Sequence, residues 1–194
     1  MSTTPNPLVV VSGFPRSGTS MMMQMLEAGG LPPLMDDSRP SDESNPKGYY
    51  EYKPVKALSS DSKWLTEAEG RCVKVISPLL RHLPIEGPYK VILMYRDLDE
   101  VVQSQQRMME RISPTLTASD HETLRSTFPR LMEMIGTWLK KQASFEVLSV
   151  DYADAINDPQ EVATRVNEFL GGTLDSKAMA SAVDPELYRS RKEP

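Results

Sequence analysis

Four short runs of apolar residues constrain the fold of this chain more than any other feature of its sequence. Apolar residues follow one another almost without interruption at Leu8–Val11, Cys72–Ile76, Val91–Tyr95 and Val147–Val150. Strands that are buried on both faces of a parallel sheet have this pattern, whereas strands with one face in water alternate apolar and polar residues. We therefore predict four buried parallel strands at these positions.

Helical patterns occupy the stretches between these strands. Apolar residues recur at helical spacing in Ser17–Ala28, Leu98–Ile112, Leu124–Gln142 and Glu161–Leu170, the third interrupted near Pro129. Helices that alternate with strands are typical of a doubly wound α/β fold. We therefore predict an α/β three-layer sandwich with a central parallel sheet, and a single domain spanning residues 1–194.

The charge balance limits the classes of partner. The chain carries a net charge of −5 at neutral pH, so no overall basic field attracts nucleic acid or an anionic membrane. A site for a polyanion must therefore be a local cluster of basic side chains. Residues 1–7 form a polar leader, which we expect to be flexible, and the apolar run behind it is far too short for a signal peptide or a membrane span.

Cysteine and histidine are too scarce to suggest a metal centre. Cys72 is the one cysteine, which rules out an internal disulfide and a cysteine-based zinc site. His82 and His121 are the two histidines, so a histidine-rich metal site is not expected either. These counts favour a reducing, cytoplasmic setting and a protein without a bound metal.

Two polar segments interrupt the alternation of strands and helices. Residues 31–48 are rich in Pro, Asp and Ser, and residues 113–121 are similarly polar. They follow the first and third predicted strands, so we expect both to rise from the carboxyl edge of the sheet, where ligands bind in such folds. Their length is typical of functional loops, and we interpret them as loops that shape a substrate pocket.

The first strand runs into a phosphate-binding sequence, GFPRSGTS, at Gly13–Ser20. In such a loop the backbone N–H groups and the dipole of the following helix attract an anion. Thr19 stands where nucleotide hydrolases have a lysine, and Arg16 offers a cation from another angle. We predict that the loop binds a single phosphate with a less charged transferable group, through these residues: Gly13, Pro15, Arg16, Ser17, Gly18, Thr19 and Ser20.

A second anion site is predicted at the end of the third strand. Arg96 follows Tyr95 at the carboxyl tip of that strand, and Ser104 comes eight residues later in the next helix. Both side chains can therefore face the same phosphate in the crevice beside the loop. The alternative is that Arg96 pairs with one of the nearby carboxylates Asp97, Asp99 and Glu100.

Taken together, three stretches resemble the sulfotransferases that use 3′-phosphoadenosine 5′-phosphosulfate (PAPS). GFPRSGTS is similar to their loop for the 5′-phosphosulfate, YRDLDEVVQS to their 3′-phosphate motif, and VLSVDYADAINDPQEVATRVNEFLGG to a later conserved segment of that family. The resemblance covers Leu8–Gly172. It implies the phosphate-loop fold of these enzymes and adds Tyr152 to the residues that bind PAPS. It also implies sulfuryl transfer to a hydroxyl or amine of a small molecule, glycan or peptide.

The resemblance extends to the catalytic groups, with one departure. Arg16 in place of lysine is similar to the branch with tyrosylprotein, carbohydrate and many bacterial sulfotransferases, and Lys74 is a second cation for the sulfuryl group. The cytosolic branch has a histidine base where this chain has Ile76, which cannot accept a proton. The arginine branch uses a carboxylate base, so the resemblance makes Glu51 the leading candidate for the base. Glu51 lies in a segment that we expect to open a helix. Asp36 and Asp37 are the alternatives, and His82 is interpreted as structural.

Two other functions remain open at this level. One is a phosphoryl transferase that lacks the loop lysine and holds magnesium through Asp97, and the other is a nucleotide-binding protein without turnover. The basic end of the chain, YRSRKEP, is either a contact for the 3′-phosphate or a frayed tail. The sequence predicts neither the acceptor nor the oligomeric state.

Overall fold

The computed structural model describes residues 6–42, 45, 47–112 and 118–187. Within them one parallel sheet has the strand order β2-β3-β1-β4-β5. The strands are β1 (Leu8–Gly13), β2 (Pro33–Leu34), β3 (Cys72–Lys74), β4 (Tyr89–Tyr95) and β5 (Phe145–Asp151). The predicted α/β fold with a central parallel sheet is therefore confirmed, and the four predicted strands are β1, β3, β4 and β5.

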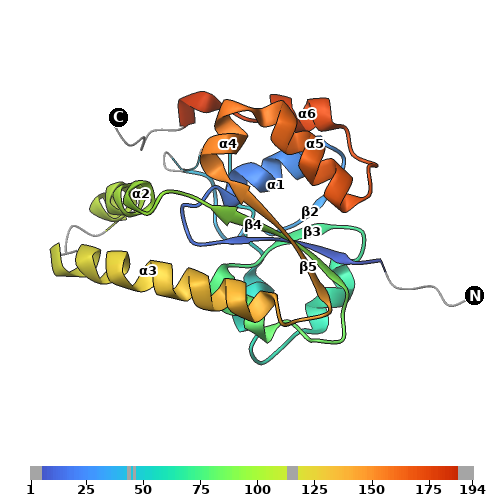
Figure 1. Ribbon diagram of the computed structural model, residues 1–194, viewed down its shortest axis with the longest axis horizontal. Coiled ribbons are helices and arrows are strands. Elements are labelled where there is room, and N and C mark those ends of the chain that lie inside the picture. The colour runs from blue at the N-terminus through green and yellow to red at the C-terminus, as the bar shows by residue number, and fades with distance from the viewer. Residues whose placement is uncertain (1–5, 43–44, 46, 113–117, 188–194) are drawn as a thin grey trace, which may run out of the picture.

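Helices cover both faces of this sheet (Figure 1). One layer consists of α1 (Thr19–Ala28), α4 (Tyr152–Asn157), α5 (Pro159–Leu170) and α6 (Ser176–Ser181). The opposite layer contains α3 (Ala118–Leu139) and the 3-10 helices η1 (Lys53–Ala57), η2 (Lys63–Ala68) and η3 (Ser77–His82). Helix α2 (Leu98–Ile112) lies beside α3, and η4 (Pro185–Leu187) follows α6.

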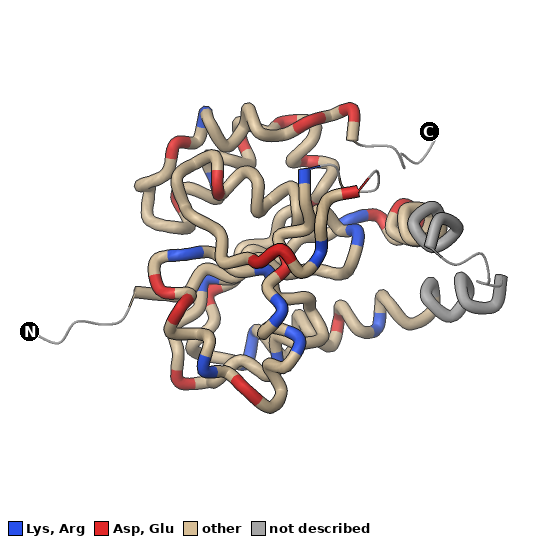
Figure 2. The backbone as a smooth tube through the Cα atoms, turned by 180° about the vertical axis from the view of Figure 1, so that it is seen from behind, with Lys and Arg blue, Asp and Glu red and all other residues tan. Residues whose placement is uncertain are grey.

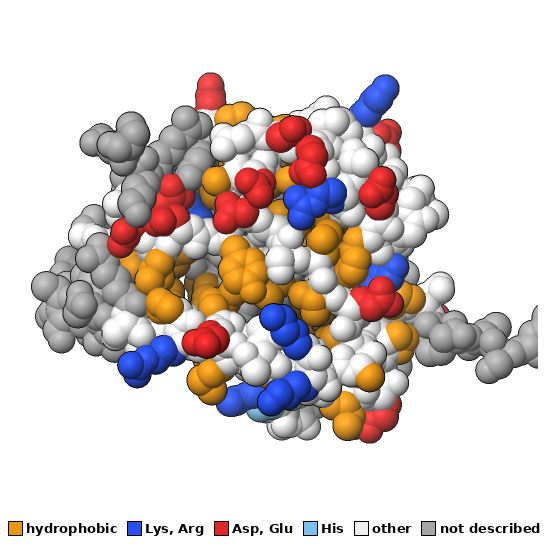
Figure 3. Space-filling model, viewed as in Figure 1, with side chains coloured by type: hydrophobic (Ala, Val, Ile, Leu, Met, Phe, Trp, Pro, Cys, Tyr) orange, Lys and Arg blue, Asp and Glu red, His pale blue; other side chains and the backbone are white. Residues whose placement is uncertain are grey.

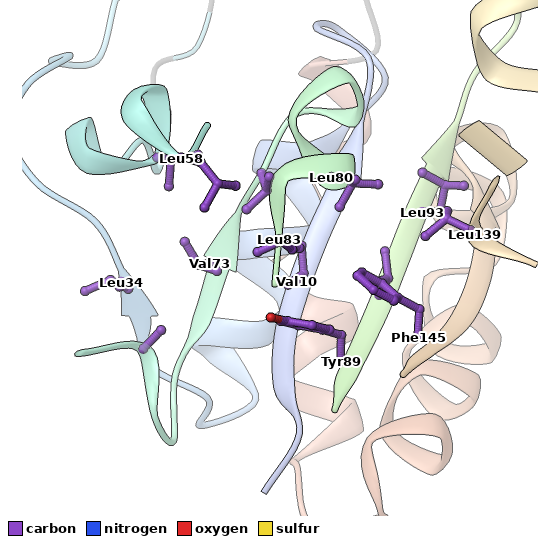
Figure 4. Packing of buried hydrophobic residues seen from close by; sticks show 14 of the residues in the cluster. Val10, Leu34, Leu58, Val73, Leu80, Leu83, Tyr89, Leu93, Leu139 and Phe145 are labelled. Carbon is purple, nitrogen blue, oxygen red and sulfur yellow. The ribbon is translucent and has the colours of Figure 1, made fainter. Parts of the chain in front are cut away.

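Each face of the sheet has its own apolar core, which explains why the strand sequences are continuously apolar. On the face towards α3 and the 3-10 helices, Val10 and Leu93 pack with Leu80 and Leu139 (Figure 4). On the other face, neighbouring strand residues pack against helices α1, α5 and α6, and Met22, Met23 and Met25 of α1 are among the largest fully buried side chains of the described chain. Both layers are therefore held to the sheet by buried apolar area.

Two elements differ from the sequence-based expectation. Strand β2 was not predicted, and it pairs with β3 through only two residues, Pro33 with Cys72 and Leu34 with Val73. Helix α3 was predicted to begin at Leu124 and to be interrupted near Pro129, but it runs unbroken from Ala118. The described end of segment 113–121 is thus helical, and residues 113–117 lie outside the described residues.

No helix in the described part of the chain is long and apolar enough to cross a membrane. Charged side chains are unevenly spread over the face shown in Figure 3, where acidic groups concentrate over the layer of α4, α5 and α6. Seen from behind, Lys and Arg residues from several segments lie close to the beginning of α2 (Figure 2). That location is the carboxyl edge of the sheet, where β1, β3 and β4 all end.

Candidate active site

The loop between β1 and α1 has the backbone of an anion-binding turn. Gly18 is the N-cap of α1 with a φ of 96°, in the left-handed region that favours glycine. A Cβ at this position would lie 2.3 Å from the ring of Tyr152, so only glycine allows the loop to pass so close to α4. Arg16 also has a positive φ, 72°, which is uncommon for a non-glycine residue and occurs most often at functional sites.

The loop hydroxyls have distinct partners. Ser17 is buried and donates to the carbonyl of Phe14 at 2.8 Å, so its hydroxyl stabilises the turn itself. The Ser20 hydroxyl receives a hydrogen bond from the Asn45 amide at 3.0 Å and donates to the Tyr49 carbonyl at 3.4 Å. Ser20 therefore joins the phosphate-binding loop to the polar segment that follows β2.

The two predicted anion motifs meet directly. Arg16 Nε donates to Ser104 Oγ at 2.9 Å, and Arg96 donates to the carbonyl of Arg16 at 3.1 Å. Burial lowers the pKa of Arg16 from its usual value, and the positive charges of Arg96 and Arg39 lower it further. An anion bound between these guanidinium groups would offset both effects.

Arg96 is also anchored from two other sides. Its Nε lies 3.0 Å from Glu100 Oε2, in a pair whose side chains are only 8% and 6% exposed. Its guanidinium carbon lies 4.4 Å from the centre of the Tyr152 ring, within the range of a cation–π contact. The predicted alternative, in which Arg96 pairs with a neighbouring carboxylate, is thus present alongside the contact with the loop.

A cavity of about 510 Å³ opens beside the loop and contains most of the predicted site residues. Those that line it are Pro15, Arg16, Gly18, Thr19, Ser20, Glu51, Lys74, Arg96 and Ser104. Of the other predicted residues, Gly13, Ser17 and Tyr152 belong to or pack against the loop. Asp36 and Asp37, the alternatives for the base, do not line the cavity, and neither does His82, which was interpreted as structural.

Lys74 is the last residue of β3, so its side chain leaves the sheet at the carboxyl edge. Its Nζ donates to the carbonyl of Tyr49. Burial lowers the pKa of Lys74 to about 8, and the nearby positive charges of Arg39 and Lys56 act in the same direction against the opposing charge of Glu51. The cavity therefore contains a cation that can lose its proton near neutral pH.

Glu51 lies in an extended stretch before η1, not at the start of a helix as predicted. Its Oε1 accepts from Arg39 at 2.7 Å and its Oε2 lies 3.2 Å from Lys56 Nζ. Burial favours a raised pKa for this carboxyl, but the hydrogen bonds from Arg39 and Lys56 outweigh burial, so the pKa lies below its usual value. Glu51 is therefore an ionised carboxylate facing the cavity.

The alternative carboxylates have structural partners. Asp36 Oδ2 accepts from the backbone N–H of Lys53 at 2.7 Å, and Oδ1 accepts from the N–H of Ser38 at 2.9 Å. Its hydrogen bonds to Ser38 and Lys53 lower its pKa. The backbone N–H of Asp36 in turn donates to the Glu51 carbonyl at 3.0 Å, so the two ends of the segment between these residues are hydrogen-bonded to each other. Asp37 is exposed.

Comparison with known proteins identifies the family. The family model described as "Sulfotransferase domain" matches residues 6–192. The chain belongs to this family. No curated protein matches the sequence significantly.

Two solved sulfotransferase domains share the fold. The sulfotransferase domain of the Synechococcus PCC 7002 olefin synthase has 20% sequence identity and a TM-score of 0.60, covering 98% of this chain and 90% of its own. The sulfotransferase domain from the curacin biosynthetic pathway has 12% identity and a TM-score of 0.54, covering 94% of this chain and 89% of its own. The predicted family and the predicted sulfuryl transfer are thus confirmed.

The sulfotransferase cavity also contains groups that were not predicted from the sequence. Arg39 and Asn45 come from segment 31–48, and Lys56 comes from η1. Ile76, at the position of the histidine base of the cytosolic branch, lines the cavity as an apolar wall with Tyr52 and Leu79. The one sequence feature that could have pointed to Arg39 as a cavity residue was its position as a basic residue within a polar loop. The predicted basic tail, residues 188–194, lies outside the described residues.

Proposed function

We propose that this sulfotransferase uses PAPS as its donor and transfers the sulfuryl group to a hydroxyl or amine of a small molecule, glycan or peptide. In this proposal the loop Gly13–Ser20 binds the 5′-phosphosulfate, and Arg96 and Ser104 bind the 3′-phosphate. Tyr152 supports both motifs, since it packs against Gly18 and lies under the guanidinium of Arg96. The polar segment 31–48 shapes the acceptor end of the cavity within one domain.

The observation that supports this donor best is the contact between the two anion motifs. Arg16 and Ser104 are 88 positions apart in the chain, yet their side chains are joined by a hydrogen bond of 2.9 Å. Arg96 completes the connection through the Arg16 carbonyl. Two cations and a hydroxyl on one wall suit a ligand that carries two phosphate groups on a single nucleoside.

The chemistry follows from the charges in the cavity. The acceptor oxygen or nitrogen forms a bond to sulfur while the bond from sulfur to the 5′-phosphate oxygen breaks, and adenosine 3′,5′-bisphosphate leaves. Arg16 and protonated Lys74 stabilise the negative charge that grows on the sulfuryl and leaving oxygens. Glu51 accepts the proton of the acceptor. Asp36 and Asp37 are less suited to this role because neither lines the cavity.

The rival phosphoryl transferase would need Asp97 to hold magnesium. The carboxylate of Asp97 accepts from the backbone N–H of Asp99 at 2.9 Å and of Glu100 at 3.2 Å, so it caps α2. It does not line the cavity.

The setting that we propose is cytoplasmic, because the one cysteine, Cys72, is a buried free thiol and no internal disulfide is available to call for an oxidising compartment.

Ligand-dependent thermal stability tests the donor. Adenosine 3′,5′-bisphosphate is expected to raise the melting temperature clearly more than AMP or magnesium-ATP, because only it engages both anion motifs. Sulfuryl transfer from PAPS should continue in the presence of a chelator. Equal stabilisation by all three nucleotides would contradict the proposed donor, and phosphoryl transfer from magnesium-ATP that stops on chelation would favour the metal-dependent rival.

A further inference from the structure

The wall of the cavity carries more positive than negative side chains. The wall includes five basic residues, Arg16, Arg39, Lys56, Lys74 and Arg96, and two acidic ones, Glu51 and Asp184. Arg96 already pairs with Glu100, and Asp184 lies 3.7 Å from Lys47. Arg39 and Lys56 both contact the carboxylate of Glu51.

This arrangement occupies both oxygens of Glu51. A carboxylate that accepts from two cations is a weak base, because the charged form is stabilised by each of them. The charged groups that face Glu51 are Arg39 from segment 31–48, Lys56 from η1 and Lys74 from β3. For Glu51 to accept a proton efficiently, at least one of these cations must be drawn away from it.

Arg39 and Lys56 can both be reached by a ligand in the cavity, which they line. Their side chains are 35% and 68% exposed, whereas that of Glu51 is only 18% exposed. Arg39 is at the same time held in place, since its guanidinium carbon lies 3.5 Å from the centre of the Tyr49 ring. A guanidinium stacked on a ring keeps its in-plane N–H groups directed at an oxyanion.

We infer that Arg39 and Lys56 bind an anionic group on the acceptor, and that this binding releases Glu51 to act as the base. The inference deepens the proposed function and rests on it. An acceptor of this kind carries its hydroxyl near Lys74 and its anionic group beside Arg39. The body between them lies against the apolar wall of Tyr52, Val55, Ile76 and Leu79. An acidic acceptor thus supplies the charge that turns an inert carboxylate into a base.

Binding of a matched pair of alcohols tests the anion site. The probes are 4-(hydroxymethyl)benzoate and 4-(hydroxymethyl)benzamide, which differ in charge but hardly in shape. Calorimetry at millimolar probe, with the protein saturated with adenosine 3′,5′-bisphosphate, is expected to show the acid binding about tenfold more tightly, the scale of one charge-assisted hydrogen bond. In Arg39→Gln and Lys56→Gln the preference should fall below about threefold, whereas the exposed control Lys63→Gln should keep it.

Several outcomes of that experiment overturn the inference. It is wrong if the acid and the amide bind equally, if neither binds, or if the preference survives both substitutions. It is also wrong if the acid is preferred only without the bisphosphate, since Arg39 and Lys56 would then serve the donor. Failure of the bisphosphate itself to bind would instead contradict the proposed function, and the probes can still be compared on the free protein.

The release of Glu51 has its own readout. In protein labelled with 13C at glutamate side chains, the Glu51 signal is identified by its loss in Glu51→Gln. The pKa read from this signal should rise when the acid binds and stay constant with the amide. A pKa of Glu51 that is unchanged by the acid would limit Arg39 and Lys56 to binding and exclude the release.

Discussion

The two sides of the cavity are built in different ways. The proposed donor side consists of a strand end, a tight loop and helix α2, and its cations Arg16 and Arg96 are partly buried and fixed by hydrogen bonds of 2.9 and 3.1 Å. The proposed acceptor side comes from η1 and the irregular stretch between β2 and η1, and its cations Arg39 and Lys56 are more exposed to water. A rigid side suits a donor that is always the same molecule, and an exposed side suits recognition that differs among relatives.

The largest effect that separates the two sides should come from Arg16→Ala. Removing this guanidinium takes away a buried charge next to the transferring group and also the partner of Ser104. We expect turnover to fall by roughly three orders of magnitude, as for loss of a preorganised electrostatic donor. Steady-state transfer from PAPS measures this. The exposed control Arg71→Ala should be nearly unaffected. Comparable losses of turnover in both variants would show that the loss does not come from the donor side.

Glu51→Gln tests the acceptor side at the next level. The substitution keeps the shape of the side chain and removes its basicity, so turnover with an alcohol that carries an anionic group should drop roughly a hundredfold while affinity for the bisphosphate is kept. An acidic phenol, which is partly ionised at the assay pH, should lose much less. Full activity on the alcohol would assign the base to Asp36, Asp37 or no residue at all.

Arg96→Ala should act on binding and not on the chemical step. We expect it to weaken the bisphosphate by about 1.5–3 kcal/mol and to leave adenosine 5′-phosphosulfate, which lacks the 3′-phosphate, nearly unchanged. The variant also leaves Glu100 buried without its partner, which lowers stability. The double variant Arg96→Gln with Glu100→Gln restores the balance of charge. If it binds the bisphosphate like the wild type, Arg96 is purely structural.

The last effect concerns stability as a function of pH and leaves the chemical step aside. Because burial holds the pKa of Lys74 at about 8, below its unfolded value, the folded protein carries fewer protons there than the unfolded chain between about pH 8 and 10.5. The free energy of unfolding therefore rises with pH through that window because of Lys74, by up to about 3 kcal/mol. Below about pH 8 this contribution is absent. Denaturant unfolding of the wild type and Lys74→Met at several pH values isolates it. A difference in unfolding free energy that is independent of pH would show that Lys74 titrates normally.

The donor side could be predicted from sequence because its spacing determines its backbone. A strand, five loop residues and a helix can be recognised without knowing the rest of the chain, and Arg96 follows from the end of a strand. The cations of the acceptor side could not be predicted, because Arg39 lies in an irregular segment with no periodicity and Lys56 in a short 3-10 helix. Strand β2 was missed since two residues cannot establish a pattern.

The predicted interruption of the helix near Pro129 was wrong for a different reason. Proline usually ends or kinks a helix, but α3 is packed on both sides of it. Phe128 stacks on Phe14 with ring centres 4.5 Å apart, and Ile135 and Leu139 are buried in the core. Tertiary contacts of this kind outweigh the local cost of a proline, and a single sequence does not reveal them.

The hydrogen bonds of Asp36 have a consequence for how such enzymes diverge and can be engineered. They clamp the two ends of the segment that carries Arg39 and Tyr49, so residues inside it can be replaced or added without moving β2 or η1. Lengthening a closed loop costs little, since the entropy of closure grows only with the logarithm of its length. Residues 37–50 are therefore a natural cassette for transplanting acceptor preference between sulfotransferases, provided that Asn45 and Tyr49, which hydrogen-bond to Ser20 and Lys74, are kept.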